Sequence, residues 1–481
     1  MTGPRPAELV VPIVVLGLLA VVGFVTIANL GQLGYDEAVY ASEARSYVSD
    51  VAVDWWRPYR PPGLPTVGAL AGVVGFSDVA VRAVALVGGL ATLALVWLVT
   101  RQLWDPRAAL FALLGAAGAP VVLAQLPLFH NDMGSAGLLL LLMWLLWDQL
   151  ETRPAPTRML LLASVVAAAA FYTRYGVVAG IVGIGLTVPL LWARRLLDHA
   201  RLVGATALVG VALLVPHLVY AASATGSPLG IMRAARNVAD STGPAIAFLT
   251  YVRAVPTRLF GVVPFMLALA AVAYAVAAAF VFATRREDAH HVRRQVWLLL
   301  PAAIAAGLTV LVSHAEPRYM LFPLLLVIMS GGGALSVAIS LLVRARPLAG
   351  RAWAVSILCT VAVAIVLGGY AGRAALTRAS DADGLPVSWK AAGERIAADA
   401  NGPCRVIAAT RPLIGWYTTC QIISMRGQPA GDLRSGGPTR TYIVFRGQDA
   451  VGNYRDLLRG AVQLPPGDRA GDDYRIYRLG P

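Results

Sequence analysis

The chain has 481 residues and a mass of 50.6 kDa, with 58% hydrophobic and only 14% charged residues. About one quarter of the residues of a soluble chain are charged, so this chain lacks the polar surface that a soluble protein needs. The composition also excludes disordered, collagen-like and disulfide-rich chains. The net charge of +14 comes mostly from arginines between apolar runs, which indicates membrane orientation and not nucleic-acid binding. The sequence therefore predicts an α-helical polytopic membrane protein.

Apolar runs that are long enough to span a membrane recur from the N-terminus onward. They cover residues 9–30, 79–100, 107–128, 133–150, 158–173, 175–192, 200–221, 256–283, 296–312, 319–343 and 353–372. Residues 64–76 are also apolar but too short to span comfortably, which favours a helix at the membrane interface. We expect about eleven transmembrane helices.

Short arginine-rich connectors set the expected orientation. Each of five connectors carries two or more arginines: 101–107, 151–158, 193–201, 285–294 and 344–351. The positive-inside rule places all five in the cytoplasm. The first loop, 31–78, and the tail from residue 373 are then extracytoplasmic. We expect the chemistry to face away from the cytoplasm, at a bacterial-type plasma membrane.

The tail is predicted to form a small α/β domain, residues 373–481, beside a transmembrane domain of residues 1–372. Helical patterns cover 386–400 and 451–459, and strand patterns cover 404–410, 441–445 and 474–479. Cys404 and Cys420 could form a disulfide in an oxidising compartment or remain two buried thiols, and both alternatives are open.

Two adjacent carboxylates, Asp36 and Glu37, follow the first apolar run directly. A carboxylate within hydrogen-bond distance of an acceptor hydroxyl can remove its proton as a general base. Alternatively, Asp36 caps the next helix and Glu37 stabilises its N-terminal end. The pair could also hold a divalent cation, although the sequence shows no further ligand set.

Further polar residues interrupt the extracytoplasmic side. Arg60 precedes two prolines, and it could contact lipid headgroups or hold a dedicated lipid phosphate. Tight turns between apolar runs carry His130, Asp132, Arg174, His314, Glu316 and Arg318. A helix cap would explain Asp132, and Glu316 could simply pair with Arg318. Their common side of the membrane predicts a shared cavity.

The order of these motifs resembles the GT-C glycosyltransferases related to protein O-mannosyltransferases and aminoarabinose transferases. The resemblance rests on D-E-x-x-Y-A from Asp36, Arg60-Pro61-Pro62, the Asp132 turn, Thr-Arg-x-Gly at Arg174, and H-x-x-P-R-Y from His314 to Tyr319. Some relatives carry lysine where Arg60 and Arg174 stand, and a basic residue at the place of Val39. The identity of the donor sugar therefore stays open.

The resemblance implies transfer of a hexose or pentose from a polyprenyl-phosphate donor to an extracytoplasmic glycan, lipid or protein. Leaving-group charge would be stabilised by arginines, so one carboxylate base suffices for an inverting displacement. The resemblance implies that Asp36 is the base and that Glu37 and Asp132 orient the acceptor or the sugar. It implies phosphate binding by Arg60, Arg174 and Arg318, supported by Tyr40. Contacts to the acceptor or the sugar are implied for His130, His314 and Glu316. No cofactor is firmly implied, and the expected partners are the donor, the acceptor and membrane lipids.

A lipid-carrier flippase or transporter is the main alternative, because it would also keep arginines and carboxylates in a membrane cavity. Transporters usually show internal repeats with broken helices in corresponding halves. The sequence shows no such repeat, and its polar residues gather on one side of the membrane. A non-catalytic scaffold would leave the loop carboxylates unexplained. These patterns favour the enzyme.

Overall fold

The computed structural model forms two compact units, each built from separated segments of the chain. The first unit comprises Met1–Thr26, Pro58–Gly63 and Ala85–Ala375, and the second comprises Ile27–Arg57, Leu64–Val84 and Leu376–Pro481. The structure describes residues 6–49, 53, 56–57, 59–238, 243–259, 261–284, 289–312, 315–345, 389–408, 411–418, 420–424, 440–446, 458–465 and 474–479. The predicted boundary between domains at residue 373 lies outside these ranges and stays a prediction.

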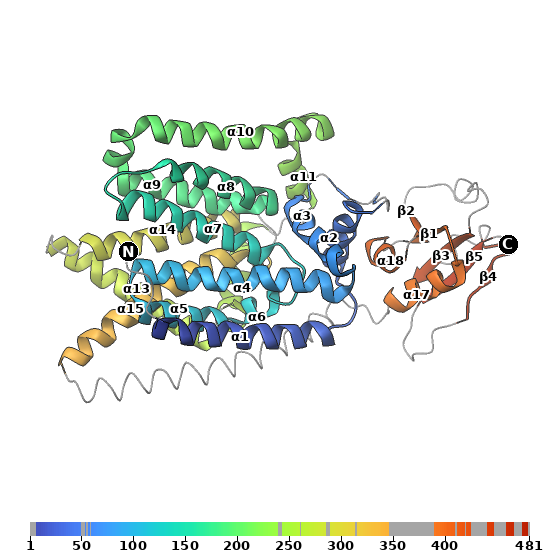
Figure 1. The fold of residues 1–481 in the computed structure, drawn as a ribbon, viewed down its shortest axis with the longest axis horizontal. Coiled ribbons are helices and arrows are strands. Elements are labelled where there is room, and N and C mark those ends of the chain that lie inside the picture. The colour runs from blue at the N-terminus through green and yellow to red at the C-terminus, as the bar shows by residue number, and fades with distance from the viewer. Residues whose placement is uncertain are drawn as a thin grey trace. The chain divides into compact units, whose positions relative to one another are not determined.

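The first unit consists of helices (Figure 1). They are α1 (Pro6–Asn29), α4 (Asp78–Leu103), α5 (Pro106–Ala117), α6 (Pro120–Gln125), α7 (Asp132–Trp147), η2 (Asp148–Thr152), η3 (Arg158–Leu160), α8 (Leu161–Thr173), η4 (Tyr175–Val177), α9 (Val178–Asp198), α10 (Ala200–Thr225), α11 (Gly230–Val238), α12 (Pro244–Ala254), η5 (Val255–Leu259), α13 (Val262–Thr284), α14 (Ala289–Val312), η7 (Pro317–Met320) and α15 (Leu321–Ala345). The ends of α1 and α4 extend into the second unit.

Seven helical stretches among the described residues are long and apolar enough to cross a membrane, so the predicted count of about eleven is not confirmed. The predicted run 107–128 is divided into α5 and α6, because Ala119 is extended and Pro120 begins a new helix. The run 158–173 contains α8, which has only 13 residues. The run 353–372 lies outside the described residues. As predicted, residues 64–76 form only the short helices α3 (Gly63–Gly68) and η1 (Ala69–Val74).

Helix α15 packs closely against α5, α13 and α14. A Cβ atom at Gly331 would lie 2.1 Å from the carbonyl oxygen of Leu267 in α13. A Cβ atom at Gly332 would lie 2.7 Å from the carbonyl oxygen of Ala108 in α5. Small residues permit such close helix contacts in a membrane, where van der Waals packing drives association. The residues directly before α15, which include Arg318 and Tyr319, form η7.

The second unit combines helices with a mixed sheet. Its helices are α2 (Tyr35–Ser46), α3, η1, the first turns of α4, α17 (Trp389–Ala400) and α18 (Arg411–Tyr417), and its strands are β1 (Cys404–Ala408), β2 (Gln421–Ser424), β3 (Arg440–Arg446), β4 (Val462–Gln463) and β5 (Tyr474–Leu479). The strand order is β2-β1-β3-β5-β4. Strand β1 pairs in parallel with β2 and β3, whereas β5 pairs antiparallel with β3 and β4 (Figure 1).

The predicted α/β character of the C-terminal region is confirmed. The sheet buries Ile407, Ile443 and Phe445 in a hydrophobic cluster. Sequence patterns did not predict α18 or β2, and the predicted helix 451–459 lies almost entirely outside the described residues. Cys404 and Cys420 form a disulfide, with their Cα atoms 4.5 Å apart.

Candidate functional site in the loops at the helix ends

Asp132 and Arg174 form an ion pair within the first unit. Asp132 is the first residue of α7, where a carboxylate is favoured by the helix dipole. Arg174 has an extended backbone between α8 and η4, so its side chain leaves the line of the helix. The Asp132 side chain is only 2% exposed, and no described residue hydrogen-bonds to its Oδ2 atom. Asp132 is therefore not a simple helix cap.

Asn131 and Gly63 both lie close to the turn at Arg174. The Asn131 amide donates a hydrogen bond of 3.1 Å to the Thr173 carbonyl, and its oxygen lies 3.3 Å from Arg174 Nη1. A Cβ atom at Gly63 would lie 2.7 Å from the Tyr172 carbonyl oxygen and 2.8 Å from Thr173 Cα. The Arg60-Pro61-Pro62-Gly63 segment can approach this turn so closely only because residue 63 is glycine.

Two guanidinium groups lie over the ring of Tyr319. The Arg174 Cζ atom is 4.5 Å from the ring centroid, and the Arg318 Cζ atom is 5.6 Å from it. Cations over an aromatic face are attracted by its quadrupole, so the ring holds two positive charges near each other. Arg318 also pairs with Glu316, and its Nη1 atom lies 3.5 Å from His130 Nδ1.

Arg174, Arg318 and Tyr319 line a cavity of the first unit. Its walls come from α7, η4, α9, α14, η7 and α15. Its charged lining consists of Asp132, Arg174 and Arg318, and its lining hydroxyls belong to Ser135, Thr309 and Tyr319. Other lining residues are apolar, among them Leu139 and Phe322. The lining holds two guanidinium groups beside apolar side chains, and each is paired with a carboxylate: Arg174 with Asp132, and Arg318 with Glu316. Guanidinium groups next to an apolar surface suit an anionic ligand with an apolar part.

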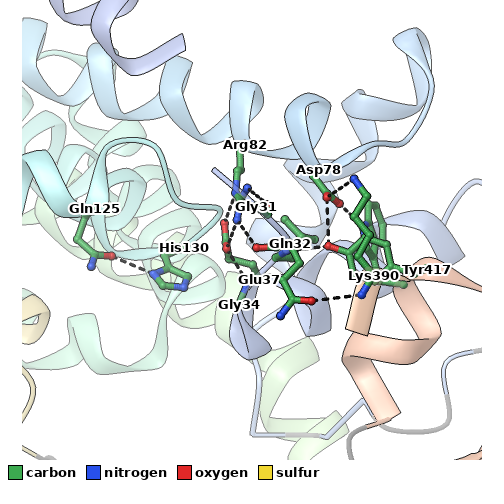
Figure 2. A network of polar contacts seen from close by, with 12 residues as sticks. Gly31, Gln32, Gly34, Glu37, Asp78, Arg82, Gln125, His130, Lys390 and Tyr417 are labelled. Atoms are coloured by element: carbon green, nitrogen blue, oxygen red, sulfur yellow. Dashed lines mark hydrogen bonds and ion pairs between the residues drawn. The ribbon is translucent and has the colours of Figure 1, made fainter. Parts of the chain in front are cut away.

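In the second unit, Glu37 forms a buried ion pair with Arg82. Arg82 Nε donates to Glu37 Oε1 at 2.9 Å, and Nη2 donates to Oε2 at 2.8 Å (Figure 2). Glu37 Oε2 also accepts a hydrogen bond of 2.8 Å from the Gly34 amide. Asp36 precedes Glu37 at the second position of α2 and is half-buried. Glu37 therefore fixes the start of the helix that carries Asp36.

The remaining predicted residues have different surroundings. Tyr40 is buried, and its ring packs edge-on against Trp56 at 5.9 Å in the second unit. Arg60 is half-buried, with its guanidinium carbon 6.0 Å from the Tyr59 ring centroid. His130 Nδ1 lies 3.0 Å from Gln125 Oε1 (Figure 2). His314 lies outside the described residues.

Sequence reasoning missed Arg82, although a signal for it was present. Arg82 lies near the start of the apolar run 79–100, and a charged residue inside such a run is expected to have a functional or structural partner. It also missed Asn131 and Tyr417, for which no local pattern exists. Their partners lie 42 and 384 residues away in the chain.

A divalent cation at Asp36 and Glu37 does not fit this arrangement. Both Glu37 oxygens already accept hydrogen bonds from Arg82, and cation binding would require release of the guanidinium. Among the residues that the structure describes, no cluster of three or more His, Cys, Asp or Glu side chains could hold a metal ion.

Comparisons with known proteins agree with this architecture. Residues 60–220 match the family model of dolichyl-phosphate-mannose-protein mannosyltransferases. The crystal structure of ArnT from Cupriavidus metallidurans in the apo state is similar over 98% of both chains, with 14% identity and a TM-score of 0.65. ArnT bound to undecaprenyl phosphate gives 15% identity and a TM-score of 0.69, over 99% of this chain and 100% of ArnT. The chain has the GT-C fold.

A more distant GT-C structure is the archaeal oligosaccharyltransferase AglB from Archaeoglobus fulgidus, in complex with an inhibitory peptide and a dolichol-phosphate. It has 12% identity and a TM-score of 0.53, over 90% of this chain and 69% of AglB. A search of curated proteins gives no significant match. The GT-C resemblance of the sequence motifs is confirmed, and so is the prediction of a helical membrane protein with a small C-terminal α/β region.

Proposed function

We propose that the protein is a membrane glycosyltransferase that moves a sugar from a polyprenyl-phosphate donor to an extracytoplasmic acceptor. The observation that carries this proposal is the cavity of the first unit, where Arg174 and Arg318 lie over the ring of Tyr319 and the lining also contains apolar side chains. A lipid phosphate combines the anionic group and the apolar chain that such a cavity suits. The family match and the ArnT and AglB likeness support a polyprenyl-linked donor.

The proposed reaction is a direct displacement at the anomeric carbon. The acceptor hydroxyl oxygen forms a bond to this carbon while the bond to the phosphate oxygen breaks, and the electron pair leaves with the polyprenyl phosphate. Asp36 receives the hydroxyl proton as general base. Arg60, Arg174 and Arg318 stabilise the charge that develops on the phosphate, and the anomeric configuration is inverted.

The carboxylates have separate roles in this proposal. Asp132 orients the sugar or the acceptor, because its buried Oδ2 atom has no partner among the described residues and Asp132 lines the cavity. Glu37 acts through Arg82 as a positioning residue, in place of the direct substrate contact that the sequence suggests. Tyr40, His130, His314 and Glu316 keep the supporting contacts implied by the motif resemblance.

The proposed orientation places the reaction and residues 373–481 outside the cytoplasm of a bacterial-type plasma membrane. It is supported by the arginine-rich connectors, since positive loops remain in the cytoplasm. A lipid-linked donor also fits an outer active site, because nucleotide sugars are not available there. The acceptor would be a glycan, lipid or protein of the cell envelope.

Reconstituted protein with labelled polyprenyl-phosphate sugar and fractions of envelope acceptors would test the function. We expect labelled product together with stoichiometric release of polyprenyl phosphate. Mass spectrometry of envelope glycans, lipids and secreted proteins from cells with and without the gene would identify the product. Movement of intact donor across the bilayer without release of phosphate would support a flippase and overturn the proposal.

The base is tested by Asp36→Asn, which keeps the size of the side chain but cannot accept the proton. Turnover should fall by about 100-fold or more while donor binding is retained. Glu43→Gln, a second carboxylate of α2 that is half-buried, is the matched control and should keep its turnover. Normal transfer by Asp36→Asn with an inactive Asp132→Asn would assign the base to Asp132.

A further inference from the structure

The segment between α1 and α2 contains no helix or strand, yet side chains hold its backbone at consecutive residues. Arg82 donates hydrogen bonds of 3.0 Å to the carbonyls of Gly31 and Gln32. Glu37 accepts from the Gly34 amide at 2.8 Å. The segment therefore has a defined path into the first turn of α2, which contains Asp36.

The amide between these contacts is held by a residue from the C-terminal region. The Tyr417 hydroxyl accepts a hydrogen bond of 2.7 Å from Leu33 N. It also lies 3.1 Å from Asp78 Oδ2, to which it donates (Figure 2). Asp78 also accepts from Trp416 Nε1 at 2.6 Å and lies 3.4 Å from Lys390 Nζ. Asp78 and Arg82 are four residues apart on α4, so both networks start from one face of that helix.

Helix α18, which carries Tyr417, docks onto α2 through a second set of contacts. Arg45 of α2 donates hydrogen bonds of 2.7 Å and 2.9 Å to the carbonyls of Gly415 and Trp416. Its guanidinium carbon also lies 4.9 Å from the Trp416 ring centroid. The disulfide of Cys404 and Cys420 closes the part of the chain that contains α18. These contacts limit the freedom of Tyr417 relative to α2.

The Tyr417 hydroxyl needs its proton for this arrangement. Burial, followed by the neighbouring Asp78 carboxylate, raises the pKa of Tyr417 far above its ordinary value. The neutral hydroxyl can accept from the Leu33 amide and donate to Asp78 at the same time. A phenolate would instead be repelled by Asp78.

We propose that Tyr417 is a positioning residue for sugar transfer, which holds the segment before α2 so that Asp36 keeps its catalytic orientation. The inference rests on the proposed role of Asp36 as base. In this proposal α18, which belongs to the C-terminal region, helps to hold the segment before α2 and so takes part in positioning the base. A small displacement of a reacting group can cost a large factor in rate, so one lost hydrogen bond at this support should be measurable.

Tyr417→Phe removes only the hydroxyl. Its kcat should fall by about tenfold while KM for the donor stays within about twofold, because the phosphate contacts are unchanged. Tyr442→Phe is the matched control, since the Tyr442 hydroxyl donates to Asp399 Oδ2 at 2.6 Å inside the same sheet region. Tyr442→Phe should keep the wild-type kcat at a temperature where both variants are folded. Wild-type kcat in Tyr417→Phe, or equal losses in the two variants, would overturn the inference.

Hydrogen exchange of the peptide that covers residues 31–37 provides a readout that does not depend on activity. Exchange should accelerate in Tyr417→Phe and remain unchanged in Tyr442→Phe, and unchanged exchange in both would overturn the inference. If Tyr417→Phe does not fold, Asp78→Asn is the substitute, because it weakens the hydrogen bond that the Tyr417 hydroxyl donates to Asp78. Hydrogen exchange of residues 31–37 should accelerate in this variant as well. Failure of the proposed function has a different signature, in which the wild-type protein itself releases no polyprenyl phosphate from the labelled donor. Normal transfer by Asp36→Asn would instead refute only the assignment of Asp36 as base.

Discussion

The carboxylate of Glu37 accepts hydrogen bonds from Arg82 through both oxygens, and each side chain is only 2% exposed (Figure 2). Loss of one partner from a buried ion pair leaves an uncompensated charge in a dry environment. The pair joins α2 to α4 beside the proposed base. Its main contribution should therefore be to structure, with an indirect effect on the reaction.

Glu37→Gln should destabilise the protein by about 3–5 kcal/mol, because the Arg82 charge remains buried without a counter-charge. Thermal unfolding in detergent would show a lowered midpoint, and turnover per folded molecule should fall far less than in Asp36→Asn. Glu43→Gln on the same helix is the control and should change the midpoint little. A stable Glu37→Gln variant with abolished turnover would instead favour direct substrate contact by Glu37.

Arg60→Ala tests the proposed phosphate contact from the first loop. It should remove about 2–4 kcal/mol of transition-state stabilisation, a rate loss of tenfold or more. Arg57→Ala is the control, because Arg57 is exposed and has the same charge in the same part of the sequence. Steady-state kinetics with a polyprenyl-phosphate sugar would measure both. Equal activity of the two variants would remove Arg60 from the phosphate site.

Arg174→Ala should cause a comparable rate loss. It should also lower the stability of the protein, because the buried Asp132 carboxylate would lose its ion-pair partner. The double variant Asp132→Asn with Arg174→Ala removes that buried charge and should recover stability without recovering turnover. Thermal midpoint and kcat, measured together, separate the two effects. Recovery of turnover in the double variant would show that Arg174 serves only to neutralise Asp132.

Gly63→Ala should reduce turnover by about tenfold. The new methyl group would lie only 2.7 Å from the Tyr172 carbonyl oxygen and 2.8 Å from Thr173 Cα, which is a steric clash. The Arg60 segment would move away from the turn at Arg174. Gly134→Ala on α7 is the matched control, since a Cβ atom there has no neighbour within 4 Å. Unchanged kinetics in Gly63→Ala would show that the close approach is not needed.

The proposed orientation can be tested with single thiols in a Cys359→Ala background, where Cys404 and Cys420 are already paired. Val462 is 50% exposed and Leu197 is 76% exposed, so both positions accept a thiol reagent. In intact cells, a membrane-impermeant maleimide should label Val462→Cys at once and Leu197→Cys only after permeabilisation. The reverse pattern would place the C-terminal region in the cytoplasm and overturn the sidedness of the site.

Local sequence was sufficient to predict a helical membrane protein and to locate most candidate residues, but not to count its spanning helices. The length and apolarity of a run are properties of consecutive residues, so α1, α4, α10 and α15 lie where their runs predicted them. The same reasoning located the turn residues Asp132, Arg174 and Arg318, because a polar residue between apolar runs is visible without any knowledge of its neighbours. It failed at 107–128, where a proline after an extended alanine divides one apolar run into two helices.

Only the tertiary structure decided which of these side chains meet. Glu37 is paired with Arg82, 45 residues away, and Leu33 is bound by Tyr417, 384 residues away. Such pairs depend on which helices pack together and on the directions of their side chains, and neither is encoded in local periodicity. Adjacent carboxylates look equivalent in a sequence. In the folded chain Glu37 is buried in an ion pair with Arg82, which holds the start of α2 in place. Its neighbour Asp36 is half-buried at the start of the same helix.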